Sequence, residues 1–366
     1  MVSNSSISKN FGEAEFLGLT SQEISNYLLL WGENRYRGSQ IYRAVYCRRQ
    51  FKFEEMTELS KALQQKLSQT ALISLPKVHS TQLSGDGTEK YLFELKDRQK
   101  IESVFIPETH RNTFCISTQV GCPMDCQFCL TALVGFARNL TVGEIVGQVL
   151  FILKDRKEKD SQSSCHSKPT NIVLMGMGEP LLNFDNVAKA LMLLADAQGV
   201  GISPHRITLS TVGLVPRILQ LGKEPIVPNL AISLSATTDE VRNQLIPINK
   251  RYPISTLLEA CEQFPLGPGQ RITFEYVLID GVNDSEADAR RLVKLLSRIR
   301  SKVNLLSLNP GRDDGMKASS PERVKQFQQL LTSKGLPAYI RRPRGVDIFA
   351  ACGQLHRAQS KLPTVH

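Results

Sequence analysis

The chain has 366 residues, of which 41% are hydrophobic, enough for one large domain with an appendage, or two domains, around a substantial core. No run of about 18 apolar residues occurs, and the N-terminal MVSNSSISKN lacks the apolar core of a signal peptide, so we expect a cytoplasmic protein without membrane contact. Lys and Arg number 45 against 35 Asp and Glu, and the net charge of +10 favours a polyanionic partner without identifying one.

The first part of the chain has the pattern of a small helical unit. Apolar residues recur at helical spacing over residues 20–46 and again over residues 53–69. Thr20 or Ser21 followed by Glu23 is a helix-capping signal. We therefore predict helices in both ranges.

Residues 76–110 are predicted to form a β-hairpin extension. The segment alternates apolar and polar residues around turn signals at residues 85–87 (Gly-Asp-Gly) and 96–98 (Lys-Asp-Arg). A few antiparallel strands are therefore expected to join the helical unit to the main body.

Residues 111–345 alternate short apolar runs with longer helical segments. Six runs have the length and composition of buried strands, and each is followed by a periodic segment. Such alternation predicts an α/β fold with parallel strands and right-handed crossovers, either a barrel or an open sheet. The six runs are TFCIS, NIVLM, RITLS, NLAISLS, RITFEYVLI and VNLLSL.

Three of the eight cysteines follow the first predicted strand in a C-x3-C-x2-C pattern: Cys122, Cys126 and Cys129. In a long cytosolic chain such a cluster is typical of metal binding or catalysis rather than of disulfides. Structural zinc sites have four protein ligands, and no nearby Cys or His supplies a fourth. A [4Fe–4S] cluster held by three cysteines leaves one iron free for a substrate or cofactor, which indicates chemistry. Cys47 and Cys261 lie in helical patterns and are expected to pack in the interior.

Polar residues occur where several of the predicted strands end. Ser and Asn at such positions are usually turn formers, but ligands bind at the carboxyl edge of parallel sheets, where all of these groups meet. The carboxylate of Glu179 suits an ammonium group. The set comprises Gly178, Glu179, Ser210, Ser233, Ser235 and Asn309.

The cysteine spacing after the first strand resembles the radical S-adenosylmethionine superfamily, in which the free iron of a [4Fe–4S] cluster binds the amino and carboxylate groups of S-adenosylmethionine. Phe128 matches a common aromatic position, and GMGEP resembles the glycine-rich motif that contacts the methionine. The resemblance implies a partial (βα)6 TIM-like radical SAM barrel. The cofactor contacts it implies are Gly178, Glu179, Ser210, Ser233, Leu234, Ser235 and Asn309.

From about residue 15 to 357, the chain resembles the RlmN/Cfr family of radical S-adenosylmethionine adenine methyltransferases. The matching blocks stand in the family's order: DGTEKYLFEL, IESVFIP, FCISTQVGCPMDCQFC, RNLTVGEIVGQV, GMGEPLLN, ITLSTVG, IPINKRYP, FEYVLIDGVND and RGVDIFAACGQL. The sequence departs from the family with LTALVGF in place of a Thr-Gly-Lys segment, and with SLSA in place of Ser-Leu-His, which affects the contact expected at Ser235. Val346 and Phe349 stand in a block where an acidic residue is frequent.

The family resemblance implies covalent roles for two further cysteines. Carbon-2 of adenine is electron-poor and cannot accept a methyl cation directly, so a radical route is required. Cys352 is implied to take a methyl group from one S-adenosylmethionine. A second molecule, making two per turnover, yields the 5′-deoxyadenosyl radical that activates this methyl group for addition to the base. Cys115 is then implied to resolve the RNA–protein crosslink by forming a disulfide with Cys352, and Glu102 matches the family's proton acceptor.

The resemblance also implies the partners. These are 23S ribosomal RNA, at the peptidyl transferase centre, and transfer RNA, at the adenosine 3′ of the anticodon, together with a reductase that supplies electrons to the cluster; we expect a monomer. Two alternatives stay open: a Cfr-type carbon-8 adenine methyltransferase of 23S ribosomal RNA, and a non-catalytic iron–sulfur RNA-binding module.

Two basic segments are candidates for RNA contact. In residues 35–53, basic side chains alternate with aromatic rings. Two interpretations are open: the rings stack on unpaired bases of RNA, or they are buried beneath a solvated basic face. Arg341, Arg342 and Arg344 precede the segment that carries Cys352.

The predicted domains are an N-terminal helical accessory RNA-binding domain (1–75), the β-hairpin extension (76–110), the radical SAM barrel (111–345) and a C-terminal segment with the methyl-accepting cysteine (346–366).

Small residues surround Cys352, namely Ala350, Ala351 and Gly353. By themselves they suit a cysteine that merely packs. Under the family resemblance they provide clearance, so we expect Cys352 on a mobile loop near the cluster.

Overall fold

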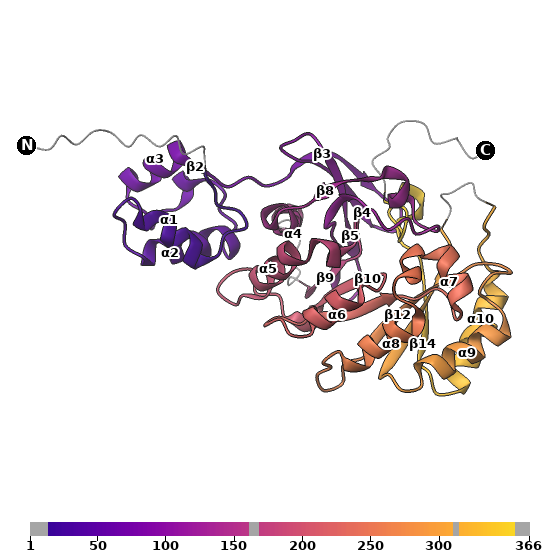
Figure 1. Ribbon diagram of the computed structural model, residues 1–366. Helices are drawn as coiled ribbons and strands as arrows, with labels where there is room; N and C mark the ends of the chain where they lie inside the picture. The colour runs from indigo at the N-terminus through magenta and orange to yellow at the C-terminus, as the bar shows by residue number, and fades with distance from the viewer. Residues whose placement is uncertain (1–13, 161–167, 310–314, 356–366) are drawn as a thin grey trace, which may run out of the picture.

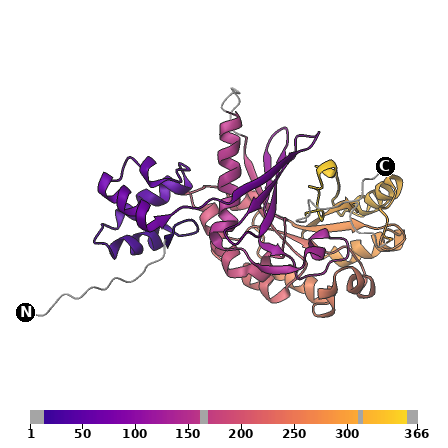
Figure 2. The same cartoon turned by 90° about the horizontal axis from the view of Figure 1, so that it is seen from above.

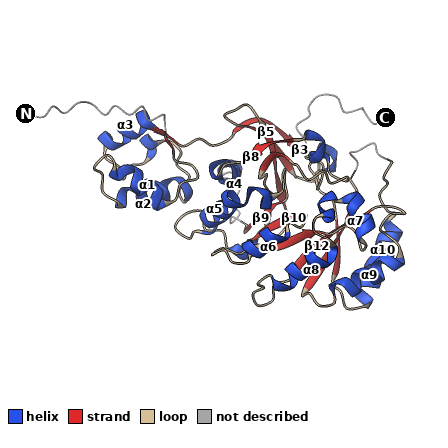
Figure 3. Ribbon diagram, in the orientation of Figure 1, coloured by secondary structure: helices blue, strands red, loops and turns tan. Residues whose placement is uncertain are grey.

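The computed structural model describes residues 14–160, 168–309 and 315–355. In these residues a small helical unit lies to one side of a large curved sheet that has helices packed on its outside (Figure 1 and Figure 3). A search of the same residues finds no helix of the length and apolar character that a membrane span requires.

The N-terminal unit consists of three α-helices closed by a two-stranded parallel ladder. Thr20 caps the first helix, because its side chain accepts a hydrogen bond from Glu23 N while the Glu23 carboxylate accepts one from Thr20 N. This confirms the predicted capping signal. The elements are β1 (Ala14–Glu15), α1 (Ser21–Leu29), α2 (Tyr36–Tyr46), the 3-10 helix η1 (Phe53–Glu55), α3 (Lys61–Thr70) and β2 (Ala71–Leu72).

The aromatic rings of the basic segment 35–53 belong mainly to the core of this unit. Tyr42, Tyr46 and Phe53 are buried, whereas Tyr36 is 52% exposed. For the three buried rings the structure therefore decides between the two interpretations: they pack beneath a basic face and are not available to stack on bases.

The two cysteines expected to be packing residues differ in their surroundings. Cys261 is buried in α8 (Ile254–Gln263), as predicted. The prediction for Cys47 is wrong. This residue is exposed and forms the C-cap of α2, one position after the last residue of the helix.

Within the described ranges, one sheet of ten strands forms the body of the protein, in the order β14-β13-β12-β11-β10-β9-β6-β5-β4-β3. All neighbours from β6 to β14 run parallel, as the alternating pattern predicted. In the described residues the two edge strands, β14 and β3, do not pair with each other, so the barrel is partial. The six predicted parallel strands are β6 (Asn112–Cys115), β9 (Thr170–Leu174), β10 (Ile207–Thr211), β11 (Asn229–Ser233), β12 (Ile272–Leu278) and β13 (Ser301–Ser307).

A seventh parallel strand, β14 (Ala338–Arg341), was not predicted. Tyr339, Ile340 and Arg341 are exposed at the edge of the sheet. An edge strand with three consecutive exposed residues has neither the apolar run nor the alternation by which buried strands are found in a sequence.

Helices occupy the crossovers between the parallel strands and cover the outer face of the sheet (Figure 3). Viewed from above, α4 rises beside the sheet, between the N-terminal unit and the antiparallel strands (Figure 2). The helices are α4 (Val142–Asp160), α5 (Phe184–Ala195), α6 (Val215–Leu221), α7 (Asp239–Leu245), α8, α9 (Glu286–Leu296) and α10 (Pro321–Ser333).

The N-terminal unit is attached to the barrel through α5 and its surroundings. Tyr42 Oη donates to Asp196 Oδ2 at 2.7 Å, just beyond the end of α5. Lys189 Nζ of α5 lies 2.6 Å from Glu23 Oε1. These contacts hold the N-terminal unit on the outer, helical side of the barrel.

The predicted hairpin extension continues the barrel sheet. Its strands are β3 (Lys77–Leu83), β4 (Glu89–Glu94) and β5 (Lys100–Pro107), joined at the two predicted turns. Because β5 pairs with β6, the extension lies directly beside the first strand of the barrel.

Candidate active site

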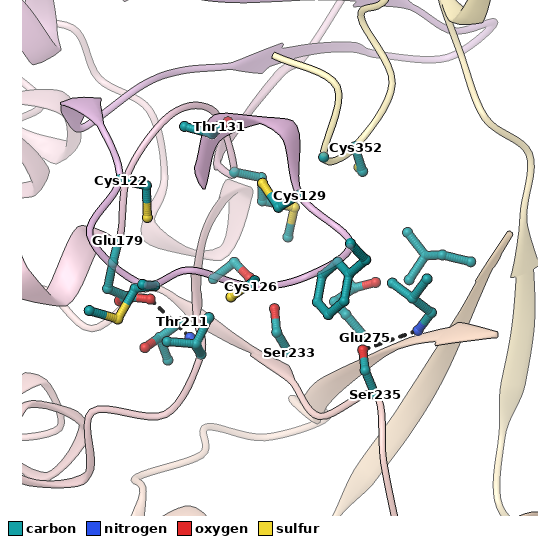
Figure 4. A pocket seen from close by; sticks show the side chains of 18 of the residues that line it. Cys122, Cys126, Cys129, Thr131, Glu179, Thr211, Ser233, Ser235, Glu275 and Cys352 are labelled. Carbon is teal, nitrogen blue, oxygen red and sulfur yellow. Dashed lines mark hydrogen bonds between the residues drawn. The ribbon is translucent and has the colours of Figure 1, made fainter. Parts of the chain in front are cut away.

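The three clustered cysteines lie on a loop at the carboxyl end of β6, inside a small hairpin (Figure 4). The hairpin is formed by β7 (Gln119–Gly121) and β8 (Phe136–Asn139), with the 3-10 helix η2 (Leu130–Val134) between the cysteines and β8. Cys122 N donates to Gly135 O at 3.0 Å, which closes the base of the loop.

The cysteine side chains fit a multi-iron cluster better than a single ion. In the described part of the chain, no three Cys, His, Asp or Glu side chains are arranged to hold one metal ion. Each cysteine ligand of a [4Fe–4S] cluster binds a different iron, so the sulfurs need not converge on one point. Cys122, Cys126 and Cys129 all line a shared cavity, which is the arrangement such a cluster requires.

Burial changes the acidity of these thiols. It raises the pKa of Cys122 to about 12 and raises the pKa of Cys126 well above its usual value, and the neighbouring cysteines add to both rises. The two thiols therefore keep their protons at neutral pH until a metal replaces them.

The cavity extends from the cysteine loop to the carboxyl ends of the parallel strands (Figure 4). It is open to solvent on one side, and the space within its lining, including solvent at its mouth, is about 1030 Å³. The predicted site residues that line it, besides the three cysteines, are Gly178, Glu179, Ser210, Ser233, Ser235, Asn309 and Cys352.

Two of the predicted cofactor contacts have fully buried side chains. Leu234 packs in the main core and is not among the residues that line the cavity. Ser235 lines the cavity, has a left-handed backbone conformation with φ of +49°, and accepts a hydrogen bond from Val277 N at 3.2 Å. The predicted contact at Leu234 therefore does not lie on the cavity, since its N–H donates to Glu275 O at 3.0 Å and its carbonyl accepts from Arg242, and Ser235 has its hydroxyl already bonded to β12.

Glu179 is held by backbone groups at the edge of the cavity. Its two carboxylate oxygens accept hydrogen bonds from Leu181 N at 3.0 Å and Val212 N at 2.9 Å. Gly178 precedes it with φ of +102°, and a Cβ there would lie 2.5 Å from Gln119 Cβ. The glycine therefore allows this loop to approach the strand that leads into the cysteine loop, and it places the carboxylate beside the cluster site.

We expect the titration of Glu179 to make the free energy of unfolding depend on pH. Burial raises its pKa to about 7, so between about pH 4.5 and 7 the folded protein keeps a proton that the unfolded chain releases, and stability falls as pH rises. Glu179→Gln removes this titration. Between pH 5 and 8 the free energy of unfolding of the wild type should therefore fall, relative to that of Glu179→Gln, by up to roughly 3 kcal/mol, at about 1.4 kcal/mol per pKa unit.

Urea unfolding without S-adenosylmethionine measures this difference, and Glu240→Gln, at an exposed position of α7, is the matched control. Parallel pH curves for the wild type and Glu179→Gln would contradict the expectation.

Arg242 joins the ends of two strands beneath the cavity. Its side chain is fully buried and donates to Val212 O at 2.7 Å, Ser233 O at 3.0 Å and Leu234 O at 3.2 Å, and to Asn249 Oδ1 at 2.8 Å. Burial lowers its pKa to about 10, so it stays charged at neutral pH. Sequence reasoning missed this residue, because a single arginine in a short helix carries no motif of its own.

Cys352 lies at the mouth of the cavity, opposite Cys129 (Figure 4). Its carbonyl accepts a hydrogen bond from Asn309 Nδ2 at 3.0 Å, and the next carbonyl, of Gly353, accepts one from Leu130 N at 2.7 Å. The residue is exposed, yet the protein atoms around its thiol and the nearby carboxylate of Glu275 raise its pKa to about 11. The structure thus places Cys352 next to the cysteine loop, although 223 residues separate Cys352 from Cys129.

The other side of the Cys352 loop is fastened to the β3–β4 turn. Asp347 accepts hydrogen bonds from Ser84 Oγ at 2.6 Å and Gly85 N at 3.2 Å. Asp86 accepts one from Gly345 N at 3.1 Å and pairs with Arg344 at 2.9 Å. The loop is therefore docked in this structure, and its mobility stays a prediction.

Cys115 and Glu102 lie beside the cavity and not on its lining. Cys115 ends β6, Glu102 lies in β5, and both are buried. Cys115 pairs with Val104, so Glu102, two residues away, faces the same side of the sheet. Burial, together with the nearby Cys352 thiol, raises the pKa of Cys115.

Glu275 is a further lining residue that sequence reasoning missed. It lies in β12, accepts a hydrogen bond from Asn304 Nδ2 at 2.9 Å, and has its pKa raised by burial. A glutamate in the middle of the apolar run ITFEYVL was the signal that could have revealed it.

A partial parallel barrel with three cysteines after its first strand and polar groups at its strand ends defines a radical S-adenosylmethionine enzyme. Residues 116–293 match the model of the radical SAM superfamily, which implies a [4Fe–4S] cluster and S-adenosylmethionine as cofactors. Residues 14–73 match the model of the ribosomal RNA large subunit methyltransferase N-terminal domain.

Relatives of known name match nearly the whole chain. The dual-specificity RNA methyltransferase RlmN of Syntrophotalea carbinolica is 50% identical over 92% of this chain and 88% of its own. That of Geobacter sulfurreducens is 47% identical over 92% of this chain and 91% of its own. A crystal structure of a radical SAM methyltransferase from Sphaerobacter thermophilus, 41% identical, superposes with a TM-score of 0.87 over 93% of this chain and 99% of that one. The chain belongs to the RlmN family of radical SAM methyltransferases.

Proposed function

We propose that this protein methylates carbon-2 of an adenosine in the peptidyl transferase centre of 23S ribosomal RNA and of the adenosine 3′ of the anticodon in transfer RNA. The observation that carries the proposal is the convergence, at one end of the sheet, of the three cluster cysteines with Cys352 and Cys115. The relatives named dual-specificity RNA methyltransferases support two kinds of RNA substrate, and the net charge of +10 suits a polyanion.

Several residues of the cavity are proposed to hold the cofactors. Cys122, Cys126 and Cys129 would bind the cluster. The buried carboxylate of Glu179 would receive the ammonium group of S-adenosylmethionine, since a cation beside it offsets the cost of burying its charge. The remaining contacts would come from Gly178, Ser210, Ser233, Ser235 and Asn309, which line the cavity, whereas Leu234 lies behind it in the core.

When bound, the cluster supplies the electron for reductive cleavage of S-adenosylmethionine, which yields a radical able to take hydrogen from an unactivated methyl group. Cys352 acts in two capacities. Its sulfur first loses its proton and attacks the methyl carbon of one S-adenosylmethionine, which displaces S-adenosylhomocysteine and leaves a methyl thioether on Cys352. After hydrogen loss, the same carbon bonds to the adenine and joins protein to RNA.

Release of the product is proposed to depend on Cys115 and Glu102. Glu102 takes the proton from the adenine carbon as the adduct gives up its unpaired electron, which the cluster would accept. The deprotonated sulfur of Cys115 then attacks that of Cys352 and the carbon–sulfur bond breaks. The carbon left on the base takes up a proton to become the methyl group, and a disulfide remains for external thiols to reduce. Both side chains face the same side of the sheet beside the Cys352 loop, which supports this division of roles.

The remaining parts of the proposal concern partners and domains. A reductase donates electrons, two molecules of S-adenosylmethionine are used per turnover, and the enzyme acts as a monomer in the cytoplasm. Residues 1–75 serve as an accessory RNA-binding domain, and Arg341, Arg342 and Arg344 meet phosphates near the target base, all three being at least partly exposed. An adenine within folded RNA must be turned out to reach the cavity, at a cost of roughly a few kcal/mol.

Mapping of the modified nucleoside tests the function. We expect the reduced, cluster-loaded protein with S-adenosylmethionine to produce 2-methyladenosine in both ribosomal and transfer RNA, resolved by chromatography and mass spectrometry of the digested RNA. Only 8-methyladenosine in ribosomal RNA would favour the Cfr-type alternative. RNA binding without cleavage of S-adenosylmethionine, unchanged in Cys352→Ala, would favour the non-catalytic module.

A further inference from the structure

A buried lysine lies against the carboxylate of Glu102. Lys90 Nζ of β4 is 3.2 Å from Glu102 Oε1 of β5, and the two side chains are only 7% and 5% exposed. The same ammonium group donates to Phe349 O at 3.3 Å. One lysine therefore connects the buried carboxylate to the loop that carries Cys352.

The strand register explains why these groups meet. Leu92 pairs with Glu102, and Val104 pairs with both Lys90 and Cys115. Since side chains alternate across a strand, Lys90, Glu102 and Cys115 all face the same side of the sheet.

The neighbouring charges of β4 lie on the opposite side of the sheet. Glu89 pairs there with Arg156 and Lys159 of α4, and Tyr91 donates to Asp155. Among the described residues, the titratable groups on the Glu102 side include Lys90, which contacts the carboxylate, Cys115 from β6 and Cys352 from the docked loop, with Glu94 and Lys100 on the same face further along the hairpin.

A buried ion pair of this kind is costly to maintain. Desolvation of both charges offsets much of their attraction, and apolar residues of similar size would often serve stability as well. Removing only one partner leaves an uncompensated buried charge, which is strongly unfavourable. The position of the pair, beside Cys115 and beneath the Cys352 loop, points to a role in the reaction.

We propose that Lys90 is a positioning residue that holds the carboxylate of Glu102 toward the target base through a buried ion pair, and that joins this carboxylate to the Cys352 loop. The inference rests on the proposed function, because it assigns to Lys90 the support of the step in which Glu102 takes a proton. The ammonium group supplies the opposite charge that an ionised buried carboxylate requires, and its bond to Phe349 O holds the loop above that carboxylate.

Unfolding of the full chain gives a test that does not depend on catalysis. In Lys90→Met the buried carboxylate of Glu102 lacks the Lys90 ammonium group, so ionising it costs more free energy and the urea midpoint should fall relative to the wild type as pH increases from 5 to 8. Lys90→Arg keeps the charge and should follow the wild type. Lys96→Met, which removes a lysine of the same hairpin from an exposed pair with Glu15, is the matched control and should show no such trend.

The fate of the RNA adduct gives the second test. Lys90→Met should resolve the RNA adduct at least about tenfold more slowly, a larger loss than any slowing of Cys352 methylation, with the acidic limb of the pH profile for resolution moved up by about one unit or more. Lys90→Arg should restore resolution. The double variant Lys90→Met/Glu102→Gln, which removes both charges, should regain the urea midpoint without regaining resolution.

Two results would overturn the inference while leaving the proposed function intact. One is adduct resolution in Lys90→Met with the wild-type rate and pH profile. The other is an equal slowing of Cys352 methylation and adduct resolution, which would indicate a merely structural role. Absence of both methylated RNA and adduct in the wild type and in Cys115→Ala would overturn the proposed function, and this inference with it.

Discussion

Replacing Cys115 with Ala is expected to leave RNA covalently attached to the protein through Cys352. The variant should complete every step up to the bond between the Cys352 methylene carbon and the adenine, and then stop. Multiple turnover should cease, with no more than a single RNA consumed per protein. Denaturing gel electrophoresis of the reaction should show a protein–RNA species that persists in excess thiol, since a carbon–sulfur bond is not opened by disulfide exchange.

The position of Cys115 explains why no other residue should substitute for it. Cys115 ends β6 beneath the loop that carries Cys352, close enough for the charge on one thiol to affect the other. Cys261, the other buried cysteine outside the cysteine loop in the described residues, lies in α8, which packs on the outside of the barrel. In the described residues outside the cysteine loop, no other buried thiol is placed to attack the Cys352 sulfur, so the adduct should be long-lived.

Two controls define the result. Cys261→Ala removes another buried thiol and should turn over normally. Cys115→Ala/Cys352→Ala should form no adduct, because the sulfur that bonds the base is gone. Normal turnover by Cys115→Ala, or an adduct that survives in the double variant, would contradict the two-cysteine mechanism.

Replacing Cys126 with Ala is expected to abolish the iron–sulfur cluster and all chemistry that depends on it. Cys126 is 7% exposed and lies at the centre of the cysteine loop, between the other two ligands. Two remaining thiolates cannot hold a [4Fe–4S] cluster that already has an open iron. Bound iron and the visible absorption of the reconstituted protein should fall to background, and with them the reductive cleavage of S-adenosylmethionine.

Stability should change far less than iron content in this variant. Cys to Ala removes one sulfur atom, which costs on the order of 1 kcal/mol in a buried site that partly relaxes. The exposed Cys47 gives a second control, since Cys47→Ala should retain full iron and cleavage. A Cys126→Ala protein that is folded and still binds a full complement of iron would show that other residues hold the metal.

Much of the fold and the metal site could be predicted because their signals are local. The apolar runs predicted six of the seven parallel strands, the Gly-Asp-Gly and Lys-Asp-Arg turns predicted the hairpins, and the Thr20 cap predicted the start of α1. The exposed edge strand β14 and the exposed Cys47 were missed or misjudged, since periodicity reports the burial of neighbours in sequence and carries no information about the end of a sheet.

The sequence by itself determined the class of chemistry. The spacing of Cys122, Cys126 and Cys129 places three thiolates on one short loop, and polar residues at strand ends must share one edge of a parallel sheet. Such statements need only the geometry of a turn and of a strand.

Only the tertiary structure decided which distant groups meet. Docking of the loop at residues 345–353 on the β3–β4 turn and on the cysteine loop brings Cys352 to the cavity mouth. The register of β4, β5 and β6 places Lys90, Glu102 and Cys115 on one face. The physical reason is that a shift of one residue in strand pairing would turn these side chains to the opposite face, and this register is set by packing across the whole sheet.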